Sequence, residues 1–171
     1  MDRGTDMDLF ATLLLLVVPT LVFRGLGAFG VSRFGTWRSS AVHGLAVLLL
    51  LTGSAHFVPD SVTVMPSHDD LVAMVPDFVP FPDFTVYFTG VLEIGGAIGL
   101  VIPATRRRAG IGLAALFVLL LPANIHAALN DIPLDGDPAT PLWFRIPEQI
   151  VYIAVALWGS GALWGARSRT V

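Results

Sequence analysis

A chain of 171 residues that is 54% hydrophobic and only 13% charged, with a mean hydropathy of +0.75, lies outside the composition of soluble globular domains. The formal net charge is −3, and all ten basic residues are arginine. The absence of Cys excludes disulfides, thiol catalysis and iron–sulfur clusters, so any redox role needs an external cofactor. We therefore expect one membrane domain over residues 1–171 that binds lipid and no nucleic acid.

Apolar stretches recur along the chain at lengths that suit a bilayer. They are Leu9 to Phe23, Ala41 to Phe57, Phe84 to Ile102, Ala109 to Leu129, and Ile146 to Trp164. At 1.5 Å per residue the last three are about 28 to 32 Å long, which matches a hydrocarbon core of about 30 Å. The second extends back through Trp37. The first is the shortest and contains Pro19, so we expect it to be tilted, kinked or partly inserted.

The connections between these stretches differ in kind. In the long segment from Val58 to Asp83, Ser67 precedes His68 and two aspartates, which is typical of an N-cap followed by acids in a first helical turn. This pattern predicts a short amphipathic helix on the outer membrane surface. The segment Thr105 to Arg108 is a tight turn, so the third and fourth stretches should be antiparallel neighbours.

Charge is segregated by sign along the chain. If the chain crosses the membrane five times, one face collects Arg24, Arg33, Arg38, Arg106, Arg107, Arg108, Arg167 and Arg169. The other face collects Asp2, Asp6, Asp8, Asp60, Asp69, Asp70, Asp77, Asp83, Asp131, Asp135 and Asp137. Because short cytoplasmic loops retain arginine, we predict an outer N-terminus and a cytoplasmic C-terminus. A four-span alternative places the acidic start beside the arginines. That acidic start also argues against a cleaved signal peptide.

Glu93 lies near the middle of the third apolar stretch, where a lone acid is costly unless other helices shelter it. On helical spacing it shares a face with small residues, namely Thr89, Gly90, Gly96 and Ala97. We therefore expect Glu93 to point into a helix interface. It is either a structural carboxyl group, protonated or hydrogen-bonded to a neighbouring helix, or a group that handles a ligand or a proton.

His56 and His126 are both predicted near the outer edge of the bilayer. With Glu93 they could bind a metal or relay protons, but interfacial histidines are often structural, and neither HxxxH nor HExxH spacing occurs. We therefore predict no metal site. His43 and His68 do not belong with the outer pair, and we expect them to be structural or solvated.

Pro122 interrupts the fourth stretch and should free the carbonyl of Val118, with Asn124 supplying an amide in the same disturbed turn. Asn124 and His126 are about 200° apart on a regular helix. Both can face one cavity only if the helix unwinds there, and otherwise one of them packs elsewhere.

The fifth stretch begins with Arg145, Pro147, Glu148 and Gln149. Pro147 suits a first helical turn. Arg145 has two interpretations: an interfacial anchor that pairs with Glu148 or a loop aspartate, or a group that engages the head group or carbonyl of a bound ligand.

Several stretches together resemble the DoxX and DoxX-like family of small integral membrane proteins. They are Gly53, Ala55, His56 and Phe57; Val75, Pro76 and Pro80 before Gly90, Val91, Leu92 and Glu93; Gly99, Leu100 and Pro103; Pro122, Ala123, Asn124 and Ile125; and Arg145, Pro147 and Gln149. The resemblance covers Ala41 to Trp164. It implies an all-α fold in which a four-helix membrane bundle carries Leu9 to Phe23 as an added N-terminal span. Glu148 departs from the family pattern, which has an apolar residue there.

Members of this family differ in function, and kinship of fold does not fix activity. They include a subunit of a thiosulfate:quinone oxidoreductase, an assembly partner of a mycobacterial membrane oxidoreductase, and vertebrate proteins that assist receptor assembly. The residues carried over as ligand-binding candidates are His56, Glu93, Asn124 and Arg145 with Gln149, and position adds His126.

We expect a quinone-linked or redox-associated subunit whose outer-leaflet cavity holds a small apolar ligand, with quinone as the cofactor. The alternatives are a non-enzymatic assembly or scaffold protein and, less favoured without a repeated half, a small transporter. No catalytic motif is present, so enzymatic activity stays open. Arginine without lysine, with abundant Ala, Gly and Val, is typical of a GC-rich prokaryotic genome. We therefore expect a prokaryotic plasma membrane location, within a membrane protein complex or a homo-oligomer.

Overall fold

A computed structural model of the chain describes residues 3–62, 64–134 and 136–163, with side chains from residue 10 onward. The described residues form six α-helices, one short 3-10 helix and no strand, which confirms the all-helical prediction. The helices are α1 (Arg3–Ala28), η1 (Ser32–Phe34), α2 (Trp37–Ala55), α3 (His68–Ala73), α4 (Pro82–Val101), α5 (Arg106–Leu129) and α6 (Leu142–Ser160). Asp2, Asp135, Trp164, Arg167 and Arg169, which the predicted topology uses, lie outside the described residues.

The first helix extends beyond the apolar stretch Leu9 to Phe23 at both ends. At 26 residues α1 is the longest described helix, and it continues through Pro19. In an apolar segment the backbone is best satisfied within a helix, so a single missing donor does not end it. Thr20 reinforces the turn because its hydroxyl donates to the carbonyl of Leu16 at 2.7 Å.

Three helices are long and apolar enough to cross a membrane. These are α1 from Phe10 to Ala28, α4 and α5. Within the described part of the chain, α2 and α6 are not long and apolar enough by the same measure, although both were predicted to be spans. Both helices bury polar side chains inside the bundle, including His43 of α2 and Glu148 of α6.

The sixth helix begins earlier than predicted. Its N-cap is Pro141, which has an extended backbone and whose carbonyl accepts from the N–H groups of Phe144 and Arg145. Pro147 therefore lies in the second turn, and its assignment to the first turn is wrong. An earlier proline starts the helix.

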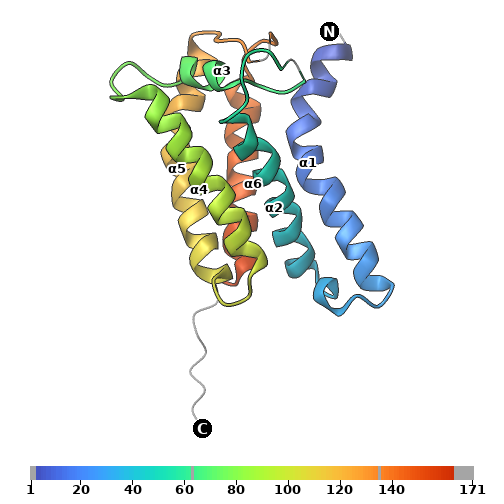
Figure 1. The fold of residues 1–171 in the computed structure, drawn as a ribbon. Coiled ribbons are helices and arrows are strands. Elements are labelled where there is room, and N and C mark those ends of the chain that lie inside the picture. The colour runs from blue at the N-terminus through green and yellow to red at the C-terminus, as the bar shows by residue number, and fades with distance from the viewer. Residues whose placement is uncertain (1–2, 63, 135, 164–171) are drawn as a thin grey trace.

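Two predictions about the connections are confirmed. Ser67 caps α3, since its hydroxyl accepts from the backbone N–H of Asp70 while the carboxylate of Asp70 accepts from the N–H of Ser67. The turn after α4 is short, and α4 and α5 pack against each other. Figure 1 shows α3 at the same end of the bundle as the start of α1, and the α4–α5 turn at the opposite end.

The helices enclose a narrow apolar core. α2 packs against α1, α4 and α6, and α5 packs against α4 and α6 (Figure 1). Core side chains that are almost fully buried include Val42, Leu45, Leu49, Leu100, Leu113 and Ala156. Large apolar side chains also cover the outer faces of the bundle, among them Leu14, Val18, Val22, Val91, Ile98, Val118, Leu119 and Ile150.

At the end of the bundle opposite α3, arginine side chains hold the last turns of two helices. Arg33 Nη2 donates to the carbonyl of Val101 at 2.9 Å, and Arg106 Nε donates to the carbonyl of Leu100 at 2.8 Å. Arg38 Nε donates to the carbonyl of Trp158 in α6 at 3.1 Å. Cations at helix C-termini also complement the helix dipole. The described loop arginines therefore lie at one end of the bundle and the loop aspartates near α3 lie at the other.

Candidate functional site

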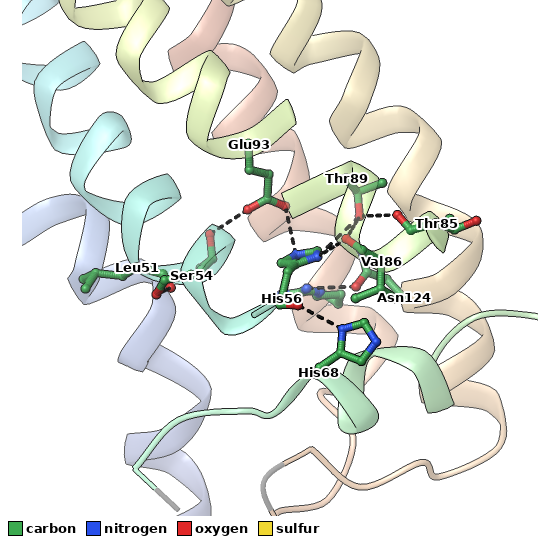
Figure 2. A network of polar contacts seen from close by, with 11 residues as sticks. Leu51, Ser54, His56, His68, Thr85, Val86, Thr89, Glu93 and Asn124 are labelled. Atoms are coloured by element: carbon green, nitrogen blue, oxygen red, sulfur yellow. Dashed lines mark hydrogen bonds and ion pairs between the residues drawn. The ribbon is translucent and has the colours of Figure 1, made fainter. Parts of the chain in front are cut away.

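Glu93 and His56 meet between α2 and α4, and we call them the inner pair (Figure 2). Both are buried, with 5% and 8% exposure. His56 Nε2 lies 3.7 Å from Glu93 Oε1, and the hydroxyl of Thr52 donates to Glu93 Oε2 at 2.9 Å. His56 Nδ1 lies 2.7 Å from the carbonyl of Val86. Because a carbonyl only accepts, Nδ1 carries a proton, and the inner pair turns Nε2 toward a carboxylate.

Close approach of the two helices positions the inner pair. Gly90 of α4 faces His56 so closely that an added Cβ would lie 2.5 Å from His56 Cβ. A glycine at this position lets the backbones pack without a side chain between them. The sequence placed Gly90 on the face of Glu93, and both residues do face α2.

His68 contradicts the expectation that it stays apart from His56. It is 7% exposed, its ring stacks on Tyr87 with centroids 4.0 Å apart, and its Nδ1 lies 2.9 Å from the carbonyl of His56. Its Nε2 lies 3.5 Å from Oδ1 of Asp83. The loop after α2 turns back, and the N–H of His68 bonds to the carbonyl of Val58 at 2.8 Å. That contact brings α3 beside the end of α2.

A second polar cluster lies around Glu148 and joins α1, α5 and α6. The side chain of Glu148 has no exposed surface. Its Oε2 accepts from Arg145 Nη1 at 2.8 Å, and its Oε1 accepts from the hydroxyls of Tyr152, at 2.7 Å, and Thr12. Arg145 Nη2 donates to Oδ1 of Asn124 at 2.8 Å. The predicted pairing of Arg145 with Glu148 is confirmed, and we call this group the Glu148 cluster.

Gln149 and His126 contact different backbone carbonyls near the Pro122 region of α5 and the end of α3. Gln149 Nε2 donates to the carbonyl of Phe117 at 2.7 Å, one residue before the carbonyl that Pro122 was expected to free. His126 faces the other way, with its Nδ1 3.1 Å from the carbonyl of Met74. α5 stays helical through this region, so Asn124 and His126 do not face one cavity.

The six predicted ligand-binding residues make separate direct contacts, although the charge of Arg145 acts on Glu93. Glu93 joins His56, Asn124 joins Arg145, and Gln149 and His126 each hold a separate backbone carbonyl. Their role in binding a ligand stays a prediction. Among the described residues, no group of three His, Cys, Asp or Glu side chains is placed to hold a metal ion.

Two surface hollows lie at the α3 end. One of about 300 Å³ is lined by Phe57, Val58, Pro59, Asp60, His68, Asp69 and Tyr87. The other, of about 400 Å³, lies between α3 and the segment around Pro133. Neither is lined by the six predicted residues. Asp69 is exposed, and its side-chain hydrogen bond with Asp60, followed by repulsion from the same carboxylate, raises the pKa of Asp69.

Several residues of these groups were not among the predicted site residues. They are Thr12, Thr52, His68, Glu148 and Tyr152. Part of this set was visible, because Arg145, Glu148 and Tyr152 are three and four residues apart and so share one helical face. Thr12 and Thr52 are distant in sequence from their partners, so no local sequence pattern predicts these contacts.

Fold and site together define an all-helical bundle that is apolar on its outer faces and carries acids inside. The chain belongs to the family described as Domain of unknown function (DUF8561), whose model matches residues 45–160. The match begins within α2 and ends with α6, so it includes the inner pair and leaves α1 outside. No curated protein and no solved structure matches the chain.

Proposed function

We propose that this chain is an integral membrane protein with a core of α2, α4, α5 and α6, to which α1 adds a further span. Three helices of sufficient length and apolarity, and apolar side chains on the outer faces, support this proposal. In the proposed orientation the α3 end faces outward and the arginine-rich end faces the cytoplasm. Kinship with DoxX is part of the same proposal and rests on the residues quoted for it.

We further propose that the inner pair receives the head group of a quinone-like ligand, which makes the protein a redox-associated membrane subunit. The observation that carries this proposal is the juxtaposition of His56 Nε2 and Glu93 Oε1 in a buried setting. Neither atom can donate to the other unless a proton is added, so the pair is suited to take up and release one proton. Quinone reduction consumes protons as well as electrons. This chain would handle a proton, and a partner subunit that carries a redox cofactor would supply the electrons.

Quinone binding to the purified protein tests this function. We expect wild-type protein in lipid nanodiscs to bind decylubiquinone, and Glu93→Gln and His56→Gln to bind about tenfold more weakly, because each loses one of the two groups that would share the proton. His43→Gln is the matched control, since His43 contacts Arg33 and the carbonyl of Ser39 near the opposite end of the bundle. Equal affinity of wild type and Glu93→Gln would contradict the proposal, as would the absence of binding to wild type.

A second candidate function is assembly or scaffolding, and the Glu148 cluster favours it. Arg145 donates to both Glu148 and Asn124 inside the bundle, which is what a structural polar core requires. A scaffold would co-purify with a larger membrane complex. Substitutions of lipid-facing residues such as Ile98 and Leu119 should then reduce complex recovery more than Glu93→Gln does.

A further inference from the structure

Two histidine–carboxylate pairs lie one above the other along α4. The inner pair is His56 with Glu93, and we call His68 with Asp83 the outer pair (Figure 2 shows His56, Glu93 and His68). In both pairs Nδ1 of the histidine is held by a backbone carbonyl and Nε2 faces a carboxylate of α4. The pairs are connected directly, because the carbonyl that holds His68 belongs to His56.

The hydrogen-bond roles in the outer pair depend on one proton. The carbonyl of His56 can only accept, so Nδ1 of His68 must be the donor. In the neutral ring Nε2 is then an acceptor, and it lies 3.5 Å from Oδ1 of Asp83, which is also an acceptor. Nε2 is buried and has no hydrogen-bond partner. Adding a proton to His68 turns this contact between two acceptors into an ion pair.

Other groups around His68 do not remove this requirement. Tyr87 of α4 stacks on the ring face, so it does not donate to Nε2 in the ring plane. Asp69 and Asp70 of α3 and Asp60 of the preceding loop add negative charge on the same side, where Asp60 and Asp69 line the hollow that His68 also lines. On the side of α5, His126 holds the carbonyl of Met74.

We infer that the outer pair is a proton-operated latch that holds α3 over the end of α2 and α4 while His68 is charged, and releases it when His68 is neutral. Closure is therefore expected toward acidic pH and opening toward alkaline pH. Release of α3 removes the hydrogen bond on the His56 carbonyl and uncovers His56. The inference concerns α3 itself and does not depend on quinone binding.

Hydrogen–deuterium exchange of the α3 backbone in nanodisc-embedded protein tests the latch. After correction for the intrinsic pH dependence of exchange, we expect protection of residues 67–75 to fall about tenfold between about pH 5.5 and about pH 8.5 in wild type. His68→Gln keeps a donor for the His56 carbonyl but takes up no proton, so its protection should not depend on pH.

Asp83→Asn gives a result in the opposite sense. The asparagine amide can donate to neutral Nε2, so this variant should stay protected at alkaline pH. Asp83 is largely exposed, at 72% of its side chain, so the substitution leaves the core unchanged. Two controls should keep the wild-type pH response. They are Asp77→Asn, at an exposed aspartate in the loop between α3 and α4, and His126→Gln.

Three outcomes would overturn the latch. They are pH-independent protection of α3 in wild type, a pH response retained by His68→Gln, and exchange of Asp83→Asn at alkaline pH as fast as in wild type. Loss of the pH response in His126→Gln would show that His126, and not His68, controls the protection of α3, and would also overturn the inference. Failure of quinone binding, in contrast, would not change the interpretation of these exchange results.

Discussion

Glu148 is buried with no exposed side-chain surface, and its Oε2 lies 2.8 Å from Nη1 of Arg145, whose own side chain is three-quarters buried. A buried charge that loses its partner is strongly destabilising, whereas replacing both partners with apolar residues is often tolerated. This ion pair therefore determines which substitutions the junction of α1, α5 and α6 tolerates.

We predict that Arg145→Met lowers the free energy of unfolding by about 3 kcal/mol, because Glu148 is left charged in the interior. The double variant Arg145→Met with Glu148→Leu should recover part of that loss. Denaturant titration of detergent-solubilised protein measures both. Arg107→Met is the control, since Arg107 is exposed at the far end of the bundle. A loss for Arg145→Met no larger than that of the control would show that the pair contributes little.

Gly90→Ala should separate α2 from α4. The added Cβ would lie 2.5 Å from His56 Cβ, so the helices must shift, at an expected cost of about 1 to 3 kcal/mol. Gly95→Ala on the same helix meets nothing within 4 Å and should be neutral or stabilising by up to about 1 kcal/mol, because alanine favours helix. Thermal unfolding compares the two variants. Equal behaviour of the two would refute the close-packing account of the inner pair.

The acidic pH dependence of stability should involve Asp69. The hydrogen bond with Asp60 raises the pKa of Asp69 above its usual value of 3.8, so the folded state holds this proton more tightly than the unfolded chain. The resulting contribution to stability is fully present below 3.8 and is lost as pH rises through the folded pKa. Asp69→Asn should flatten this part of a series of unfolding temperatures against pH. Asp77→Asn should leave the slope as in wild type, and a slope unchanged in Asp69→Asn would exclude the Asp60–Asp69 contact as its source.

The proposed orientation can be read with single cysteines, because the native chain has none. In intact cells a membrane-impermeant maleimide should label Asp77→Cys, which lies in the loop beside α3. It should label Arg107→Cys, in the first turn of α5, only after the membrane is opened. Labelling of both without opening the membrane, or the reverse order, would contradict the proposed topology.

The helices were predictable from the sequence. In a long apolar segment the backbone N–H and C=O groups must bond to each other, and a helix satisfies them within the segment. The cap at Ser67 and the tight turn before α5 were also predictable, since both are local patterns of neighbouring residues. The ends of α1 and α6 were not. α1 starts before Leu9 and continues past Phe23, and α6 starts before Pro147, which was expected in its first turn.

The polar groups divide in the same way. Burial of Glu93 was predictable from its small neighbours on one helical face. The direct contacts of Glu93 with His56 and of Arg145 with Asn124 were not, because they depend on which helix faces which. Hydrogen bonds such as those from Thr12 to Glu148 and from Thr52 to Glu93 join residues 136 and 41 positions apart. The contact of His68 with His56 was not predictable, because it depends on the return of the chain onto Val58.

Arginine side chains contact backbone carbonyls at the C-terminal ends of α4 and α6, so arginine has a structural role there besides its charge. Any cation can bias insertion, but Arg33 uses separate nitrogens to reach the Val101 carbonyl and Nε2 of His43 at once. A lysine ammonium is a single point and could not bridge the two. Exchanging Arg33 for lysine would therefore preserve the positive charge on which the proposed orientation depends, while it would weaken the contact between the α1–α2 connection and the end of α4.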